Sequence, residues 1–93
     1  MSVRILLPGV LADLADGCRH LEVDLPPGTL AELLDALGAL HPVLVRRLRD
    51  ETGGVRRYVN VYVDGADVRG EQGLLTAVHA GAVVHVLPSV AGG

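Results

Sequence analysis

Hydrophobic and polar residues in the first quarter of the chain predict two short strands. The run Val3–Pro8 is almost continuously apolar and is stopped by a Pro-Gly step, as expected for a buried strand. In Cys18–Leu25 apolar residues alternate with polar ones, which is the period of a strand with one solvated face. Because the two segments are close in sequence, we expect them to pair as an antiparallel hairpin.

The clearest helical pattern begins at Thr29. The Thr29 side chain can cap the first free amides while Glu32, three residues later, reaches back, which is the signature of a capping box. Leucines then recur at helical spacing and form one apolar stripe, made of Leu30, Leu33, Leu34, Leu37 and Leu40. We expect this helix to end near Leu40, before a His-Pro step, and Val43–Arg49 to add another helical turn.

The most regular alternation in the chain lies in Arg57–Val63. Three valines occupy one face of this predicted strand, and Tyr58, Asn60 and Tyr62 occupy the other. Asp64-Gly65 follows directly and predicts a tight hairpin turn into a short return strand.

The last part of the pattern predicts a helical turn within Gln72–Gly81 and a final apolar strand, Ala82–Leu87, ended by Pro88. The resulting order, β-β-α-β-β with a small hairpin arm, predicts a two-layer α+β fold. It matches a β-grasp (ubiquitin-like) arrangement, a mixed four- to five-stranded sheet with one main helix packed on one face. We expect the first and last strands, the most apolar ones, to lie side by side at the sheet centre. We predict one domain over residues 1–88 and a flexible C-terminal Gly-Gly tail over residues 89–93.

Composition removes several classes of function. The 93 residues allow one small domain, and a net charge of −3 without a basic block argues against nucleic-acid binding. All 8 basic residues are arginines, so lysine-dependent Schiff-base chemistry and phosphate loops are excluded. A single cysteine excludes an intrachain disulfide. No apolar run approaches the ~20 residues of a membrane span, and no signal peptide is evident. We therefore expect a cytoplasmic protein that does not bind membranes.

Candidate catalytic and metal-binding side chains are scattered. The four histidines, His20, His41, His79 and His85, lack the spacing of a metal site, so no metal is predicted. Cys18 has no C-x-x-C partner, and we expect it to be packed rather than reactive. Pairs of carboxylates fall in predicted turns, where solvated surface is the ordinary outcome. The pattern predicts no active site within the domain.

The C-terminal residues are the exception. With 12 glycines in the chain, two glycines at the last two positions arise by chance about 2% of the time. A cloning scar or an ordinary loose end is the alternative explanation. Because glycine has no Cβ, Gly92 and Gly93 can pass through a narrow enzyme channel. The carboxylate of Gly93 is therefore the candidate reactive group.

Four segments, taken with the predicted order of elements, carry a resemblance to a known family. They are Arg57–Val63, Asp67–Arg69, Gly73–Val78 and the ending Leu87–Gly93. The pattern resembles the ubiquitin-like sulfur-carrier proteins of bacteria, the MoaD/ThiS type, over essentially the whole chain. It looks most similar to the CysO-like carriers of actinobacterial cysteine biosynthesis.

This resemblance implies a carrier and not an enzyme. In the family, a ubiquitin-activating-enzyme-like adenylyltransferase uses ATP and Mg²⁺ to adenylate the terminal carboxylate, here that of Gly93. A sulfur donor enzyme then displaces AMP and leaves a thiocarboxylate. In the cysteine branch the sulfur attacks an aminoacrylate on a cysteine synthase-like pyridoxal-phosphate enzyme, and a metalloprotease releases cysteine. The carrier itself is expected to bind no cofactor.

Partner enzymes are expected to dock on the sheet face that points away from the helix. By alternation this face carries a mixture of apolar and polar side chains that is typical of transient interfaces. The expected contacts are Tyr58, Asn60, Tyr62, His85 and Leu87, followed in the tail by Val90 and Ala91.

The pattern leaves the sulfur acceptor open. The alternatives to cysteine are molybdopterin, with the chain as small subunit of molybdopterin synthase beside its large subunit, a thiolated tRNA, and a secondary metabolite with its thiolating enzyme. A different class of function is a ubiquitin-like protein modifier or binding module, whose Gly-Gly end forms an isopeptide bond. Intact mass distinguishes these classes, because a carrier exchanges oxygen for sulfur whereas a modifier appears in covalent adducts.

Overall fold

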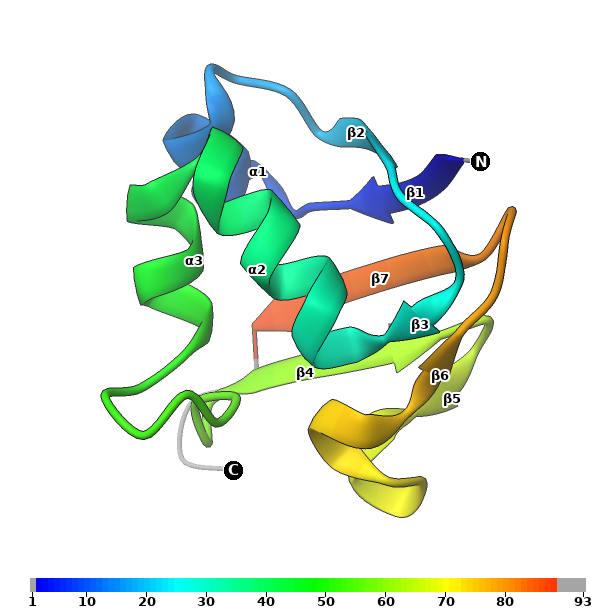
Figure 1. Ribbon diagram of the computed structural model, residues 1–93. Coiled ribbons are helices and arrows are strands. Elements are labelled where there is room, and N and C mark those ends of the chain that lie inside the picture. The colour runs from blue at the N-terminus through cyan, green and yellow to red at the C-terminus, as the bar shows by residue number, and fades with distance from the viewer. Residues whose placement is uncertain (1, 89–93) are drawn as a thin grey trace.

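A mixed five-stranded sheet forms one layer of the protein in a computed structural model that describes residues 2–88 (Figure 1). Across the sheet the order is β2 (His20–Asp24), β1 (Ser2–Leu6), β7 (Val83–Pro88), β4 (Val59–Val63) and β5 (Ala66–Asp67). β1 and β7 pair in parallel, and the other neighbours pair antiparallel. The predicted hairpin of the first two strands and the predicted meeting of the first and last strands are both confirmed.

Helices cover one face of this sheet. α2 (Leu30–Leu40) crosses the sheet, α3 (Pro42–Leu48) packs beside it, and the short α1 (Gly9–Ala12) follows β1 (Figure 1). A second, two-stranded sheet pairs β3 (Gly28–Thr29) with β6 (Ala77–Val78) at the start of α2. The predicted two-layer α+β fold is confirmed, with α3 as a second helix in the helical layer.

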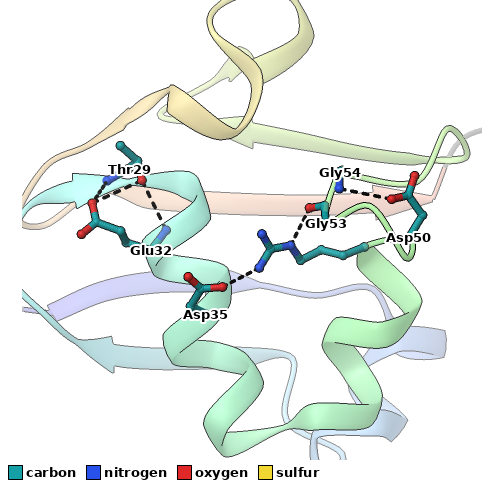
Figure 2. Close-up of polar contacts among 7 residues, drawn as sticks. Thr29, Glu32, Asp35, Asp50, Gly53 and Gly54 are labelled. Carbon is teal, nitrogen blue, oxygen red and sulfur yellow. Dashed lines mark hydrogen bonds and ion pairs between the residues drawn. The ribbon is translucent and has the colours of Figure 1, made fainter.

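The start of α2 is fixed by the capping box predicted from the sequence. The backbone N–H of Glu32 donates to Thr29 Oγ1 at 3.3 Å, and the backbone N–H of Thr29 donates to Glu32 Oε1 at 3.0 Å (Figure 2). Two amides that the helix cannot pair internally are thereby satisfied. Thr29 also lies in β3, so the cap joins the helix to the small sheet.

The core lies between α2 and the inward face of the sheet. Four leucines of the predicted stripe are buried, and they pack with alternate residues of the strands into one aliphatic cluster. The cluster residues from the five-stranded sheet are Val3, Ile5, Val23, Val59, Val61, Val63, Val84 and Val86. Leu40 departs from the prediction, because its side chain is 62% exposed in the last turn of α2.

Several boundaries differ from the prediction. The second strand begins at His20 rather than Cys18, and β4 begins at Val59, so Arg57 and Tyr58 belong to the preceding turn. Gly73–Leu75 forms the predicted helical turn, but β6 follows it within the segment expected to be helical. The predicted tail over residues 89–93 lies outside the described residues.

Candidate functional site

The outward face of the sheet carries a row of side chains that crosses all five strands. The register aligns His20 of β2 with Leu6 of β1, Leu6 with His85 of β7, His85 with Tyr62 of β4, and Tyr62 with Asp67 of β5. A second cross-strand pair, Asn60 and Leu87, lies on the same face one step closer to the end of β7. The structure therefore brings together four of the five domain residues predicted to bind partners.

This face is open and partly apolar. His85 is exposed and Leu87 is 36% exposed, whereas Tyr62 and Asn60 are half-buried by their neighbours. An open depression of about 430 Å³ lies over β4 and β7, lined by Tyr62, Asp64, Gly65, Val83, His85 and Leu87. Such a surface can accept an apolar side chain of a partner while its rim offers polar contacts.

Tyr58 lies apart from the strand alternation. It belongs to the turn before β4, and its side chain is 58% exposed. Period-two alternation therefore does not set its direction. The remaining predicted contacts, Val90 and Ala91, and the predicted reactive residues Gly92 and Gly93 lie outside the described residues.

The hydrogen bonds between β7 and β4 determine where their pairing ends. At the Asp64 end of the β4–β7 pairing, the backbone N–H of Asp64 donates to the Val83 carbonyl at 2.9 Å. Because antiparallel pairs alternate between bonded and non-bonded positions, the last hydrogen-bonded pair is that of Asn60 with Leu87. Pro88 then falls at a non-bonded position, where its missing N–H costs the ladder no bond.

A tight turn at Asp64 and Gly65 closes one end of the β4–β7 pairing. Asp64 has φ 49° and Gly65 has φ 88°, the left-handed values that a two-residue hairpin turn requires. The Asp64 carboxylate also accepts the backbone N–H of Val83 at 2.9 Å. The depression on the outward face is therefore bordered by a fixed turn at one end.

Arg69 lies at the Pro88 end of the β4–β7 pairing, and no sequence pattern indicated its contacts. Its Nη2 group donates to the carbonyls of Arg56 at 3.1 Å, Arg57 at 3.0 Å and Val59 at 2.7 Å. Its Nη1 group donates to the Asn60 side-chain oxygen. One guanidinium thus holds the chain that leads into β4. In the sequence, Asp67–Arg69 stood out only as part of the family resemblance. The spacing of residues in this segment does not indicate which groups Arg69 contacts.

The loop that connects α3 to β4 is folded around Asp50. The Asp50 carboxylate accepts hydrogen bonds from the Thr52 hydroxyl and from the backbone N–H of Thr52 at 2.9 Å. It also accepts the backbone N–H of Gly54 at 3.2 Å (Figure 2). The hydrogen bonds from Thr52, and a smaller contribution from Gly54, hold the pKa of Asp50 below its usual value.

Arg49 ties this loop to α2. Its Nε donates to the Gly53 carbonyl at 2.6 Å, and its Nη1 pairs with the Asp35 carboxylate at 2.7 Å (Figure 2). Loop and helix are thereby joined on the side of the molecule that carries α3.

Other reactive side chains show no catalytic arrangement. Three of the histidines are exposed, and no cluster of three metal-ligating side chains occurs within residues 2–88. The prediction that Cys18 is packed was wrong, because its thiol is exposed. In the same described segment, no helix is long and apolar enough to cross a membrane.

Comparison with known proteins gives a consistent result over the whole chain. Residues 5–93 match the ThiS family. The "Sulfur carrier protein CysO" of Mycobacterium tuberculosis is 36% identical over 95 residues, with 100% of both chains covered. The crystal structure of that organism's CysO matches with a TM-score of 0.86 and 32% identity, covering 95% of this chain and 99% of that one.

Two further solved structures extend the comparison. The crystal structure of the BexX/CysO complex of Amycolatopsis orientalis matches with a TM-score of 0.82 and 32% identity, over 98% and 99% of the two chains. The crystal structure of SAMP1 of Haloferax volcanii matches with a TM-score of 0.81 and 32% identity, over 100% of both. These similarities confirm the predicted ubiquitin-like β-grasp fold and the predicted resemblance.

Proposed function

Because this chain belongs to the ThiS family, we propose that it carries sulfur as a thiocarboxylate on its terminal glycine, Gly93. It is a sulfur carrier protein of the CysO-like type and not itself an enzyme. The observation that carries the proposal is the full-length match to CysO, which extends through the segment that follows β7 and contains Gly92 and Gly93.

The chemistry requires two steps on the Gly93 carboxylate. One carboxylate oxygen attacks the α-phosphorus of ATP on an adenylyltransferase that also binds Mg²⁺, and pyrophosphate leaves. A sulfur nucleophile supplied by a donor enzyme then attacks the acyl carbon, and AMP leaves. Adenylation is needed because a free carboxylate resists nucleophiles, and the product sulfur is an exposed, soft nucleophile.

The outward face of the sheet supports this function as the docking surface. β7 crosses the centre of the sheet and reaches Pro88 directly beside the Asn60–Leu87 pair. A partner seated on Tyr62, His85 and Leu87 would therefore lie next to the residues that follow Pro88. We propose that Tyr58, Val90 and Ala91 extend this contact toward the reactive end.

We propose cysteine biosynthesis as the pathway because CysO matches over the full length of both chains at 36% identity. The acceptor would be an aminoacrylate on a pyridoxal-phosphate enzyme, and a metalloprotease would then release cysteine and regenerate the carrier. The BexX/CysO complex shows that a CysO of another organism assembles with a second protein. Secondary-metabolite thiolation and molybdopterin synthesis are the alternative acceptor pathways.

Extension of the tail tests the proposed role of Gly93. One alanine added after Gly93 moves the carboxylate by up to ~3.5 Å, and reactivity in a preorganised site is lost with shifts near 1 Å. Pyrophosphate release with the cognate adenylyltransferase should therefore stop, and no thiocarboxylate should appear by mass spectrometry. Thermal stability should stay unchanged. Full turnover of the extended protein, without trimming back to Gly93, would refute the sulfur-carrier proposal.

A second variant tests the shape of the tail rather than its length. Gly92→Val should also prevent activation, because a β-branched side chain restricts the backbone and widens the tail. Normal activation of this variant would show that the partner's channel accepts a full-sized residue next to Gly93.

The match to SAMP1, a small archaeal modifier protein, favours protein modification as a second candidate function. In that case the Gly93 carboxylate would form an isopeptide bond with a lysine of another protein. Intact mass of the chain isolated with its activating enzyme separates the two functions. A sulfur-for-oxygen exchange indicates the carrier, and covalent adducts with other proteins indicate the modifier.

A further inference from the structure

Arg69 reaches from the edge of the sheet back to the chain that precedes β4. It lies in a 3₁₀ turn, Val68–Gly70, that begins immediately after β5. The Asp67 side chain accepts the backbone N–H of Arg69 at 2.9 Å and so fixes the start of this turn. The side chain that leaves the turn is exposed, yet its two Nη groups make four hydrogen bonds.

These bonds take the place of a neighbouring strand. β5 contributes two residues, and its pairing with β4 ends at Tyr62 and Asp67. On this edge of β4, within residues 2–88, no strand continues beyond this point, so the earlier part of β4 pairs with β7 alone. The guanidinium donates instead to the carbonyls of Arg56, Arg57 and Val59. A charged donor makes stronger hydrogen bonds than a neutral amide, so this part of β4 is firmly held.

The same guanidinium also acts on the last hydrogen-bonded pair between β4 and β7. Its Nη1 group holds the side chain of Asn60, and the backbone of Asn60 forms the last hydrogen-bonded pair with Leu87. Pro88, the next residue, lies at a non-bonded position of this pairing, opposite Val59. The position of this end of β7 therefore depends on how firmly Asn60 and Val59 are fixed.

We propose that Arg69 is a positioning residue that fixes the end of β7, Leu87 and Pro88, after which the C-terminal residues follow. It acts through Val59 and Asn60, and it makes no hydrogen bond with His85 or Tyr62 of the outward row. This inference rests on the proposed function, because the position of this end of β7 matters for the delivery of the Gly93 carboxylate to an activating enzyme. Delivery in a near-attack position is sensitive to small displacements.

Arg69→Met keeps an unbranched apolar stem in place of the side chain and removes all four hydrogen bonds. Arg47→Met is the matched control, because Arg47 is exposed in α3 and its side chain makes no hydrogen bond or ion pair within residues 2–88. Arg69→Lys keeps the charge but offers a single nitrogen, which cannot reach acceptors on four residues at once.

Amide hydrogen exchange tests the structural part without reference to activation. The ratio of exchange rates at Leu87 and His85, two bonded positions of β7, cancels any change in global stability. In Arg69→Met the Leu87 amide should exchange about tenfold faster relative to the His85 amide, and in Arg47→Met the ratio should stay as in the wild type. An unchanged ratio in Arg69→Met would overturn the inference.

Pyrophosphate release with the adenylyltransferase tests the functional part. Arg69→Met should lower kcat roughly ten- to hundredfold, because the carboxylate is delivered less accurately. KM should change much less, because Asn60 alone among the docking residues loses a bond to Arg69, whereas Tyr62, His85 and Leu87 make none with it. Arg69→Lys should also be impaired, and Arg47→Met should behave as the wild type. Wild-type kinetics in Arg69→Met, or a rise in KM alone, would overturn the inference. No release by the wild-type protein would instead refute the proposed function on which it rests.

Discussion

Replacing Leu34 with alanine should destabilise the protein strongly, whereas the same change at Leu40 should not. Both leucines lie in α2 and both belong to the apolar stripe. Leu34 is 2% exposed and packs in the core cluster, whereas Leu40 is 62% exposed. Any difference between the two variants therefore reports burial and not helix propensity, because both replace leucine with alanine in one helix.

The magnitude follows from the buried carbons. Leu→Ala removes three carbons, and each buried carbon is worth about 0.8 kcal/mol on transfer from water. The incompletely filled cavity raises the loss to about 3 kcal/mol, within the range of about 2–5 kcal/mol for such changes. A chain of this size has a free energy of unfolding of about 5–14 kcal/mol, so the variant should still fold.

Urea denaturation followed by circular dichroism measures the effect. With a slope of about 1.5 kcal/mol per molar urea, the midpoint for Leu34→Ala should fall by about 2 M. The midpoint for Leu40→Ala should change by less than about 0.5 M, as expected for an exposed site. Equal midpoints for the two variants would show that Leu34 does not face the core.

Three further predictions concern docking, capping and acid sensitivity. Tyr62→Ala should weaken binding to the activating enzyme by about 1–2 kcal/mol while circular dichroism stays native; normal affinity in a calorimetric titration would remove Tyr62 from the interface. Thr29→Ala should lower the free energy of unfolding by about 1 kcal/mol, and Thr29→Ser should retain most of it, as measured by urea denaturation. Hydrogen bonds from Thr52 lower the pKa of Asp50 in the folded protein, so their contribution to stability is present above the usual value of 3.8 and is lost as the pH falls through the folded pKa. An NMR titration of the Asp50 carboxyl should show a midpoint below 3.8, and a midpoint above it would contradict the hydrogen-bond geometry.

Local signals in the sequence were sufficient for the main elements. The Thr29–Glu32 pair and the leucine stripe predicted α2, because capping and helical spacing depend on residues three and four positions apart. Alternation predicted most of β4, and it also placed Asn60 and Tyr62 correctly on the face opposite the core. These features depend on neighbours in the chain, which a pattern can show.

Features that depend on distant partners were not predictable in this way. β6 is two residues long and exists because it pairs with β3, so no periodicity could reveal it. Leu40 has the spacing of the leucine stripe, but its side chain lies beyond the core. Helical spacing cannot show where the sheet surface that packs against the helix ends. The contacts of Arg69 join residues that are 9 to 13 positions apart, and three of the four acceptors are backbone carbonyls, which carry no sequence signal.

The parallel pairing of β1 with β7 has a consequence for how the protein is made. Among the described strands, β1 leaves the ribosome first, yet its neighbour at the sheet centre is β7, which leaves last and also pairs with β4. A nascent chain that stops before Val83 lacks the middle of its sheet and cannot bury Ile5 or Val61 against it. Such long-range pairing delays folding until late in synthesis. The nascent chain should therefore stay sensitive to protease until β7 has emerged, and gain resistance in a single late step.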